Sequence, residues 1–173
     1  MKPLRRRAAL VTVLRAAGVA ALVPVVAPVM TPAKAATPPS FDTTHAAWTA
    51  LLRKHVRLLR AGQATQAHYA GFAAERAALT AYRASLAAVT PAVFAAWPRA
   101  ERQAFLINAY NACTVELVLT RYPGLKSIKD LGGLLSSPWK PKWIALLGTQ
   151  VSLDDIEHAM LRKRGDYDDP RVH

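Results

Sequence analysis

The sequence predicts an α+β fold that is rich in helix toward its N-terminal side and has a small antiparallel sheet near residues 142–152. Apolar residues recur at helical spacing over much of residues 44–121, which favours packed helices. Two short apolar runs flank Gly148, as in a β-hairpin, and a full set of helix signals follows over residues 151–165. We therefore expect one domain of helices packed around a short hairpin.

The first 35 residues have the layout of a secretory signal peptide. A basic start precedes the apolar run "AAGVAALVPVVAPVM", and "AKA" at 33–35 supplies the small residues found before a cut. The run is too short to span a bilayer as a helix. The sequence predicts cleavage after Ala35, export to the periplasm or beyond, and no membrane span afterwards. N-terminal analysis of the exported protein checks the cut, and a retained basic start would contradict it.

Cleavage changes the charge of the chain. The sequence has 23 basic and 11 acidic residues, a formal net charge of +12, and six of the basic residues precede Ala36. The remaining chain keeps 17 basic and 11 acidic residues, a net +6. Because these basic residues are scattered along the sequence, they do not predict nucleic-acid binding.

Residues 36–47 form a lead-in and the start of the first of two long helices that the sequence predicts. The first runs to about residue 60, with Asp42, Thr43 or Thr44 as its cap and Gly62 at its end. The second covers residues 73–88. Residues 64–72 are ambiguous, with a short extended piece as one interpretation. The apolar stripe of the second helix consists of Leu79, Tyr82, Leu86 and Val89.

A short helix and then the central helix follow. Thr90 caps the short helix with proline at its first position, and it ends near Trp97. The central helix opens at Pro98 and reaches about Arg121, before a Tyr-Pro-Gly terminator.

The C-terminal part mixes short elements. "SIKD" at 127–130 predicts a short helix, and "SSPWKPK" at 136–142 a loop. Residues 142–153 read as a hairpin with Gly148 at the first turn position. In the helix over 151–165, Ser152 and Asp155 form a capping box.

Two amides, Asn108 and Asn111, interrupt the apolar stretch "AFLINAYNACTVELVL" of the central helix. They share one helix face, from which Tyr110 points away. A buried amide without a partner costs about 1–3 kcal/mol, so each is expected to bond either neighbouring backbone or a ligand. We predict that they bridge the central helix to residues 151–173.

Glu157 and His158 are the other polar pair of interest. As helix neighbours they face about 100° apart, so they cannot both reach one atom. His158 instead suits a surface pair with Asp154 or Arg162, and a functional role for Glu157 or His158 is the alternative interpretation. No motif has the spacing of metal ligands, so neither a metal nor a cofactor is predicted.

Cys113 is the only cysteine of the chain, so an internal disulfide is excluded. Its position in the middle of an apolar helix favours a small core residue over a nucleophile. A reactive thiol needs a helix start or a nearby cation to lower its pKa, and neither is evident in the local sequence.

Five segments, "FLINAYNA", "YPGLKSIKDLGG", "SPWK", "LLGTQVSLDDIEHAMLR" and "DPRVH", closely resemble in order and spacing the bacterial domain of unknown function family 547. The resemblance covers about residues 48–173. The chain departs from the family pattern at Leu106, commonly tryptophan, and at His68, commonly acidic. The resemblance implies these signature positions: Asn108, Tyr110, Asn111, Pro138, Trp139, Lys140, Asp154, Glu157, His158, Asp169, Arg171 and His173.

Two function classes follow. The first is an exported binding or scaffold domain for a small-molecule or peptide ligand. Its ligand-binding or structural polar face would consist of Asn108, Asn111, Tyr110, Glu157, His158, Arg171 and His173. The second rests on a distant likeness to papain- and transglutaminase-type enzymes. It is an incomplete copy of a thiol-type hydrolase or acyltransferase.

The resemblance also implies a C-terminal truncation. In the family, the "DPRxH" motif continues into an apolar strand and a cysteine-containing segment, whereas this sequence stops at His173. The expectation is an incomplete domain. Residues 36–173 alone would then aggregate or melt without cooperativity, because a strand partner is missing.

Overall fold

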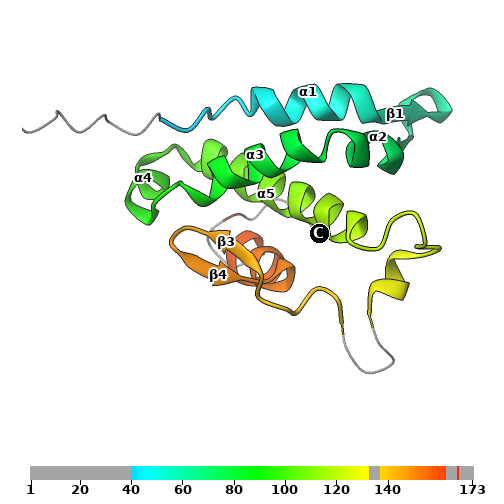
Figure 1. Ribbon diagram of the computed structural model, residues 1–173. Coiled ribbons are helices and arrows are strands. Elements are labelled where there is room, and N and C mark those ends of the chain that lie inside the picture. Colours follow the sequence, from blue (N-terminus) through cyan, green and yellow to red (C-terminus); the bar gives the residue numbers. More distant parts are fainter. Residues whose placement is uncertain (1–39, 133–136, 163–166, 168–173) are drawn as a thin grey trace, which may run out of the picture. The chain divides into compact units, whose positions relative to one another are not determined.

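The computed structural model describes residues 40–132, 137–162 and 167 (Figure 1). The chain divides into two units, Met1–Pro38 and Pro39–His173, and the second holds every described residue. The predicted signal peptide lies outside the described residues. The whole "DPRVH" motif, which contains Asp169, Arg171 and His173, also lies outside the described residues.

Four layers make up the described fold, and the predicted α+β class is confirmed (Figure 1). Helix α1 packs on α2 and α3, these two pack on α5, and the β3–β4 hairpin and η3 lie on the other side of α5. The elements are α1 (Ala46–His55), β1 (Val56–Leu59), η1 (Arg60–Gly62), β2 (Ala64–Ala67), α2 (Tyr69–Ala74), α3 (Arg76–Ala87), α4 (Pro91–Ala96), α5 (Arg99–Leu119), η2 (Ile128–Leu131), β3 (Ile144–Leu146), β4 (Thr149–Val151) and the π-helix η3 (Asp155–Leu161).

Helix α1 is shorter than predicted, because residues 56–59 form a strand. Strand β1 pairs antiparallel with β2, from Val56 opposite Ala67 to Leu59 opposite Ala64. Arg60 (φ 51°) and Gly62 (φ 92°) provide the left-handed backbone of the connecting turn. The helical prediction for 56–60 is wrong, whereas the extended interpretation is confirmed for Ala64–Ala67. The N-cap position of α1 is His45 and not Asp42, Thr43 or Thr44, although the Asp42 carboxylate accepts from the N–H of Ala46, the first helical residue, at 2.9 Å.

The expected helix over 73–88 is split at Glu75 into α2, which starts earlier at Tyr69, and α3. The predicted apolar stripe of α3 is confirmed, since Leu79, Tyr82, Leu86 and Val89 are all buried. The cap of α4 is confirmed as well, because Thr90 Oγ1 accepts from the N–H of Val93 at 3.3 Å. Helix α5 follows its predicted course from Arg99 to Leu119.

The β3–β4 hairpin lies where it was predicted, but its turn differs by one residue. Leu146 pairs with Thr149, so the turn is Leu147-Gly148, with φ values of 49° and 74°. Positive φ at both positions is the requirement of a type I′ turn. The predicted Gly148-Thr149 turn is therefore wrong, because a leucine takes the first turn position.

The capping box after the hairpin is confirmed in both directions. Asp155 N–H donates to Ser152 Oγ at 2.9 Å, and Ser152 N–H donates to Asp155 Oδ2 at 2.9 Å. The helix then widens, since the N–H of Arg162 donates to the carbonyl of Glu157, five residues earlier, at 3.0 Å. The predicted helix is thus helical through Leu161, with π geometry.

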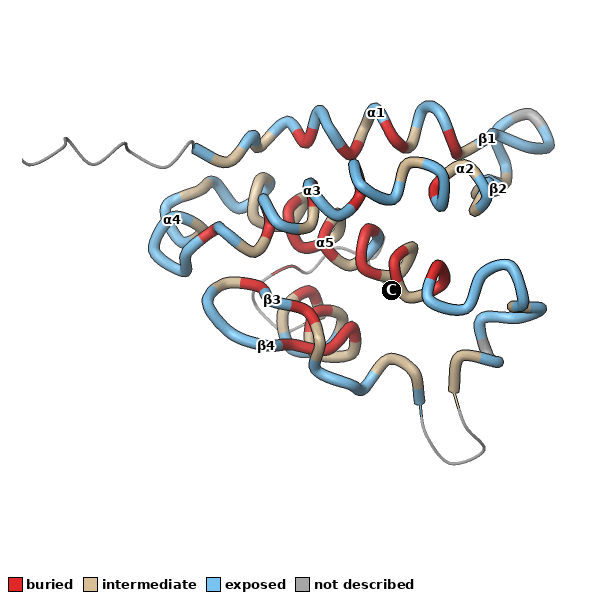
Figure 2. Tube along the Cα trace, in the orientation of Figure 1, coloured by how far each residue is buried: buried red, intermediate tan, exposed pale blue. Residues whose placement is uncertain are grey.

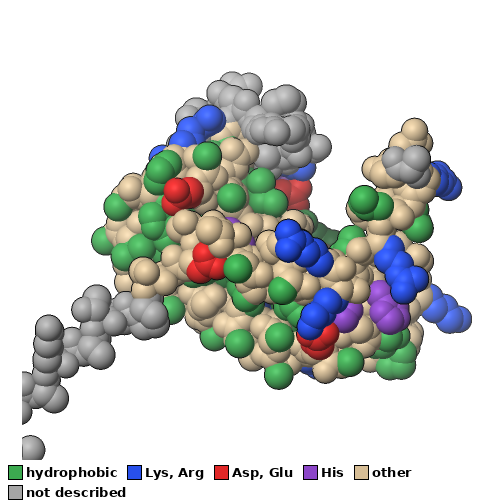
Figure 3. Space-filling view, turned by 90° about the horizontal axis from the view of Figure 1, so that it is seen from above, with side chains coloured by type: hydrophobic (Ala, Val, Ile, Leu, Met, Phe, Trp, Pro, Cys, Tyr) green, Lys and Arg blue, Asp and Glu red, His purple; other side chains and the backbone are tan. Residues whose placement is uncertain are grey.

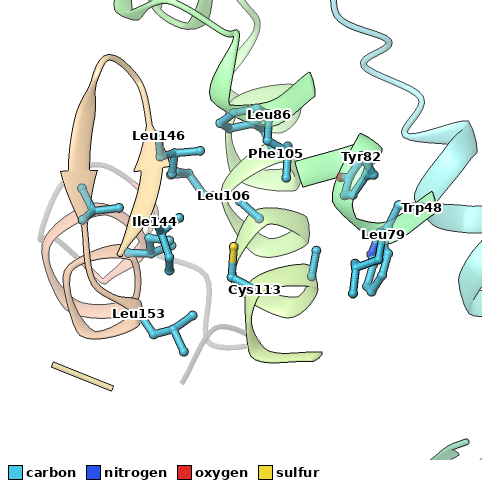
Figure 4. Packing of buried hydrophobic residues seen from close by; sticks show 14 of the residues in the cluster. Trp48, Leu79, Tyr82, Leu86, Phe105, Leu106, Cys113, Ile144, Leu146 and Leu153 are labelled. Atoms are coloured by element: carbon cyan, nitrogen blue, oxygen red, sulfur yellow. The ribbon is translucent and has the colours of Figure 1, made fainter. Parts of the chain in front are cut away.

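The core lies on both sides of α5 (Figures 2 and 4). On one side are Trp48, Leu79 and Tyr82 from α1 and α3, and on the other are Ile144 and Leu146 from the hairpin (Figure 4). The fully buried large side chains are Trp48, Phe72, Phe105, Leu79, Leu86, Leu106, Leu146, Leu153 and Ile156. Among the described residues, no helix has the length and apolar character needed to cross a membrane.

Candidate functional site

The polar groups of Tyr110, Trp139 and Glu157, which come from three separate segments, meet at the Tyr110 hydroxyl. The Tyr110 hydroxyl donates to Glu157 Oε2 at 3.0 Å and accepts from Trp139 Nε1 at 3.1 Å. Helix α5, the segment before β3, and η3 supply one group each. The carbonyl of Trp139 also accepts from the N–H of Asp154 at 3.1 Å. These bonds tie the start of η3 and the segment before the hairpin to the central helix.

The charge of Glu157 is balanced inside the same group. Glu157 Oε1 lies 2.9 Å from Arg162 Nη2, so both carboxylate oxygens have partners. His158 is exposed on the same helix, and its Nε2 lies 3.7 Å from Asp154 Oδ1. The predicted surface pair of His158 with Asp154 is confirmed. Because its groups satisfy one another, the Tyr110–Trp139–Glu157 set is first of all a bridge between segments.

The two asparagines do not occupy the predicted buried face. Asn111 is exposed and Asn108 is half-buried. Within the described part of the chain, no hydrogen bond joins either side chain to η3; Tyr110 provides that link. The predicted burial of Asn111 is therefore wrong, and the bridge to η3 uses Tyr110 instead. The part of the prediction that concerns residues 163–166 and 168–173 lies outside the described residues.

Removing the Tyr110 hydroxyl tests the bridge. We expect Tyr110→Phe to lower the free energy of unfolding by about 1–2 kcal/mol, because the partly buried Glu157 carboxylate and Trp139 N–H each lose a partner. Urea unfolding of both proteins measures it. Tyr122→Phe is the matched control, because Tyr122 is exposed. Equal midpoints for the two variants would contradict a stabilising bridge.

Two tyrosines, the buried Tyr82 and the half-buried Tyr110, make the stability depend on alkaline pH. Burial raises the pKa of Tyr82 and of Tyr110 above the usual 10.0. The bond to Glu157 raises the pKa of Tyr110 further, and the bond from Trp139 opposes this. Above that pH the unfolded chain loses tyrosine protons that the folded chain keeps. The folded state then binds more protons, so the free energy of unfolding falls as pH rises.

Urea midpoints measured from about pH 8 to about pH 11 check this loss of stability. In Tyr82→Phe the fall should be shallower, because one of the two shifted groups is gone. A midpoint that is unchanged across this range in the unsubstituted protein would contradict the expectation.

A cavity of about 230 Å³ lies between α3, α5 and β3. Its walls include Leu86, Ala109, Ile144 and Leu146, with the charged Arg83 as the exception. The residues that line it are Thr80, Arg83, Ala84, Leu86, Ala87, Ala109, Cys113, Trp143, Ile144, Ala145 and Leu146. Thr80, Ala84 and Ala145 are exposed, so the cavity opens to solvent on that side.

Cys113 lies at the wall of this cavity and is only 2% exposed. Burial raises the pKa of its thiol, although Arg83 nearby opposes the shift. A raised pKa keeps the thiol protonated and unreactive. The interpretation of Cys113 as a core residue is confirmed.

Arg83 belongs to a charged group that the sequence analysis missed. Glu116 on α5, with a side chain only 10% exposed, accepts from Arg76 Nε at 3.2 Å and also pairs with Arg76 Nη2. Arg83 Nη1 lies farther off, 3.6 Å from Glu116 Oε2, and the guanidinium sits 5.0 Å from the ring centre of Trp143. One carboxylate thus faces two arginines. The signal in the sequence was Glu116, a carboxylate within the apolar second half of the central helix.

A second cavity of about 230 Å³ lies beyond the hairpin turn, where Arg102, Leu106, Leu147 and Met160 contribute to its lining. Arg102 Nε is buried there without a hydrogen-bond partner, as Arg83 Nε is at the first cavity. In the described ranges, no cluster of histidine, cysteine and carboxylate side chains is arranged to hold a metal ion.

The fold and these features define a small α+β domain with polar bridges on one flank of its central helix and two cavities along another. Residues 94–173 match the family model described as "Protein of unknown function, DUF547", which is the family that the sequence motifs resemble. The match contains Tyr110, Trp139 and Glu157 but not α1–α3, so it starts later than the expected residue 48. No curated protein and no solved structure matches the chain.

Proposed function

We propose that the chain is an exported binding domain whose ligand occupies the cavity between α3, α5 and β3. The signal-peptide layout of the first 35 residues supports export. The cavity supports binding, because ligand sites are concave, mostly apolar, and carry few polar groups that orient the ligand. The Asn108 and Asn111 face is less suitable, since neither residue lines the cavity between α3, α5 and β3 or the second cavity beyond the hairpin turn.

One observation carries the proposal. Arg83 lines the apolar cavity, and its Nε is buried without a hydrogen-bond partner. A buried donor without a partner is costly, so such a group marks a place where a ligand acceptor gains a bond.

The charges nearby indicate which acceptor fits. Glu116 already accepts two bonds from Arg76, and its contact with Arg83 is longer, at 3.6 Å. Arg76, Arg83 and Glu116 together carry a net charge of +1, and Arg83 places it at the cavity. Arginine binds carboxylates especially well because its planar donors match their two oxygens. The proposed ligand is therefore a small organic acid with an apolar body, which would pack against Leu86, Ala109 and Ile144.

Calorimetric titration with octanoate and with octanol tests the proposal. We expect octanoate to bind and octanol to bind at least about tenfold more weakly, because only the acid can bond Arg83. Arg83→Gln should remove the difference between the two ligands. Arg102→Gln is the matched control, because it changes the arginine at the other cavity and should leave octanoate binding intact.

Three outcomes would overturn the proposal. No binding of either compound would contradict the cavity as a ligand site. Equal binding of acid and alcohol would contradict the role of Arg83. A loss of binding in Arg102→Gln, with Arg83→Gln unaffected, would assign the ligand to the second cavity instead.

A further inference from the structure

The β1–β2 hairpin extends from the end of α1 and exposes two leucines. Leu58 is 74% exposed and Leu59 is 41% exposed. In antiparallel pairing, neighbouring residues face opposite sides, so each face of the hairpin presents one of them close to the turn. Figure 3 shows this part of the molecule projecting from the rest, with hydrophobic and basic side chains on it. Exposed leucines at a projecting tip indicate a contact surface.

The charge around these leucines has one sign. No acidic residue occurs between Asp42 and Glu75. In this part of the chain Lys54 pairs with Glu75 at 2.9 Å, whereas Arg53, Arg57 and Arg60 are exposed and make no ion pair with any described residue. The tip therefore combines apolar side chains with arginines whose charge is not balanced by a neighbour.

We propose that the β1–β2 hairpin docks this domain, tip first, onto the surface of an anionic lipid bilayer. Leucine side chains gain by leaving water for the boundary between headgroups and acyl chains, while arginines bind lipid phosphates and extend toward the headgroups. The match in charge favours an anionic surface. It disfavours a second copy of the same hairpin, because arginines would then face arginines.

The backbone limits how deep the hairpin goes. A two-stranded hairpin has unpaired N–H and C=O groups along both outer edges, and these need water. Within the turn, Gln63 N–H donates to the carbonyl of Arg60 at 3.2 Å, so some of the backbone hydrogen-bonding groups at the tip already have partners. Insertion therefore stays at the level of the headgroups. This docking is independent of the proposed ligand cavity, which is lined by α3, α5 and β3.

A fluorophore at the tip tests the proposal locally, so that the apolar first 35 residues do not decide the result. An environment-sensitive dye is placed on Thr65→Cys, opposite Leu58 in the hairpin, and for comparison on Ala78→Cys, exposed on α3. The native thiol, Cys113, is buried. Vesicles of phosphatidylcholine with and without phosphatidylglycerol are added to the full chain. We expect a blue shift only for the tip dye and only with phosphatidylglycerol.

Variants separate the contribution of the leucines to vesicle binding from that of the arginines. In Leu58→Ser with Leu59→Ser, the blue shift should disappear, because the dye is no longer carried into the interface. Each of Arg57→Gln and Arg60→Gln should weaken the vesicle affinity of the tip by about fivefold, as expected for one basic residue near an anionic surface. Lys140→Gln, at an exposed position in the segment before β3, should leave it unchanged.

Several results would overturn the proposal. Equal shifts for the two dye positions would show that the hairpin is not the docking element. Equal shifts on neutral and anionic vesicles would exclude the role of the arginines. A response of the tip dye to polyglutamate, without any response to vesicles, would assign the surface to an acidic protein partner.

Discussion

Phe105→Ala should destabilise the domain by about 3–5 kcal/mol. Phe105 has no exposed surface and lies on α5 at the centre of an aromatic group. The ring centres of Phe41, Trp97 and Phe94 lie 5.4, 5.4 and 5.5 Å from its own. Removing the ring leaves a void that these neighbours cannot fill without moving, since interiors are close-packed and Phe94 and Trp97 are held by α4 while Phe41 precedes α1. Urea unfolding gives the change from the midpoint and slope.

Val93→Ala is the control for this substitution. Val93 lies on neighbouring α4 and is 45% exposed, so its loss should change stability by no more than about 0.5 kcal/mol. If Phe105→Ala lowered the free energy of unfolding no more than Val93→Ala does, the result would contradict the aromatic packing described around Phe105. The same experiment tests whether the described helices unfold as one cooperative unit.

Gly71→Ala should also destabilise the protein, although alanine is the better helix former. A Cβ at Gly71 would lie 2.2 Å from His55 Nδ1, well inside contact distance. The imidazole cannot easily turn aside, because its Nε2 lies 3.0 Å from Glu75 Oε1 and its ring packs 5.0 Å from Phe72. We expect a net loss of about 1–3 kcal/mol from this overpacking. Without the clash, the substitution would gain up to about 1 kcal/mol.

A double variant isolates the clash. In a His55→Ala background the cost of Gly71→Ala should fall sharply, because the closest contact is gone and only His68 Nδ1, at 3.0 Å, remains close to the added Cβ. Gly124→Ala supplies a comparison, since a Cβ there would meet only the carbonyl of Arg121 at an ordinary 3.6 Å. A stabilising Gly71→Ala in the unsubstituted protein would show that His55 has room to move.

Helical periodicity predicted the elements that face the core and failed where the chain leaves it. Leu79 and Leu86 are buried as their spacing requires, and α3 forms there. Val56 and Leu59 continue the helical spacing of α1, yet Leu59 is exposed and both belong to β1. Spacing reports which residues share a face, but it does not report whether anything covers that face. The β-branched Val56 and the Gly62 turn were the local signals for a hairpin.

The sequence placed the polar bridge in the correct segments and included Tyr110 and Glu157 in the predicted polar face, but it assigned the bridging role to Asn108 and Asn111. Asn108 and Asn111 were chosen because amides are unusual in an apolar helix. Tyr110 lies between them in the sequence, about 100° from Asn111 and about 160° from Asn108 around the helix, and its hydroxyl makes the contact with Glu157. The side of α5 that contacts η3 is decided by tertiary packing. Because α5 is apolar on most sides, the sequence alone does not identify that side.

The pairing of Glu157 with Arg162 was beyond prediction for a different reason. In an α-helix, residues five apart face directions about 140° apart, so they do not meet. In η3 the hydrogen bond runs from Arg162 back to Glu157, which stacks the two residues and brings their side chains within 2.9 Å. A reading that assumes α geometry considers only pairs three or four residues apart. It finds His158 with Asp154 and overlooks the ion pair that neutralises Glu157.

The leucine at the first turn position of the β3–β4 hairpin bears on the order in which the chain folds. A left-handed backbone at a residue other than glycine costs about 1–2 kcal/mol, and Leu147 adopts one with φ 49°. Its half-buried side chain, at the wall of the second cavity, recovers that cost only after α5 is in place. An isolated two-stranded hairpin is marginal in any case. A peptide of residues 142–153 should therefore remain unstructured in water, and this hairpin is expected to form late, on a surface that the helices have already assembled.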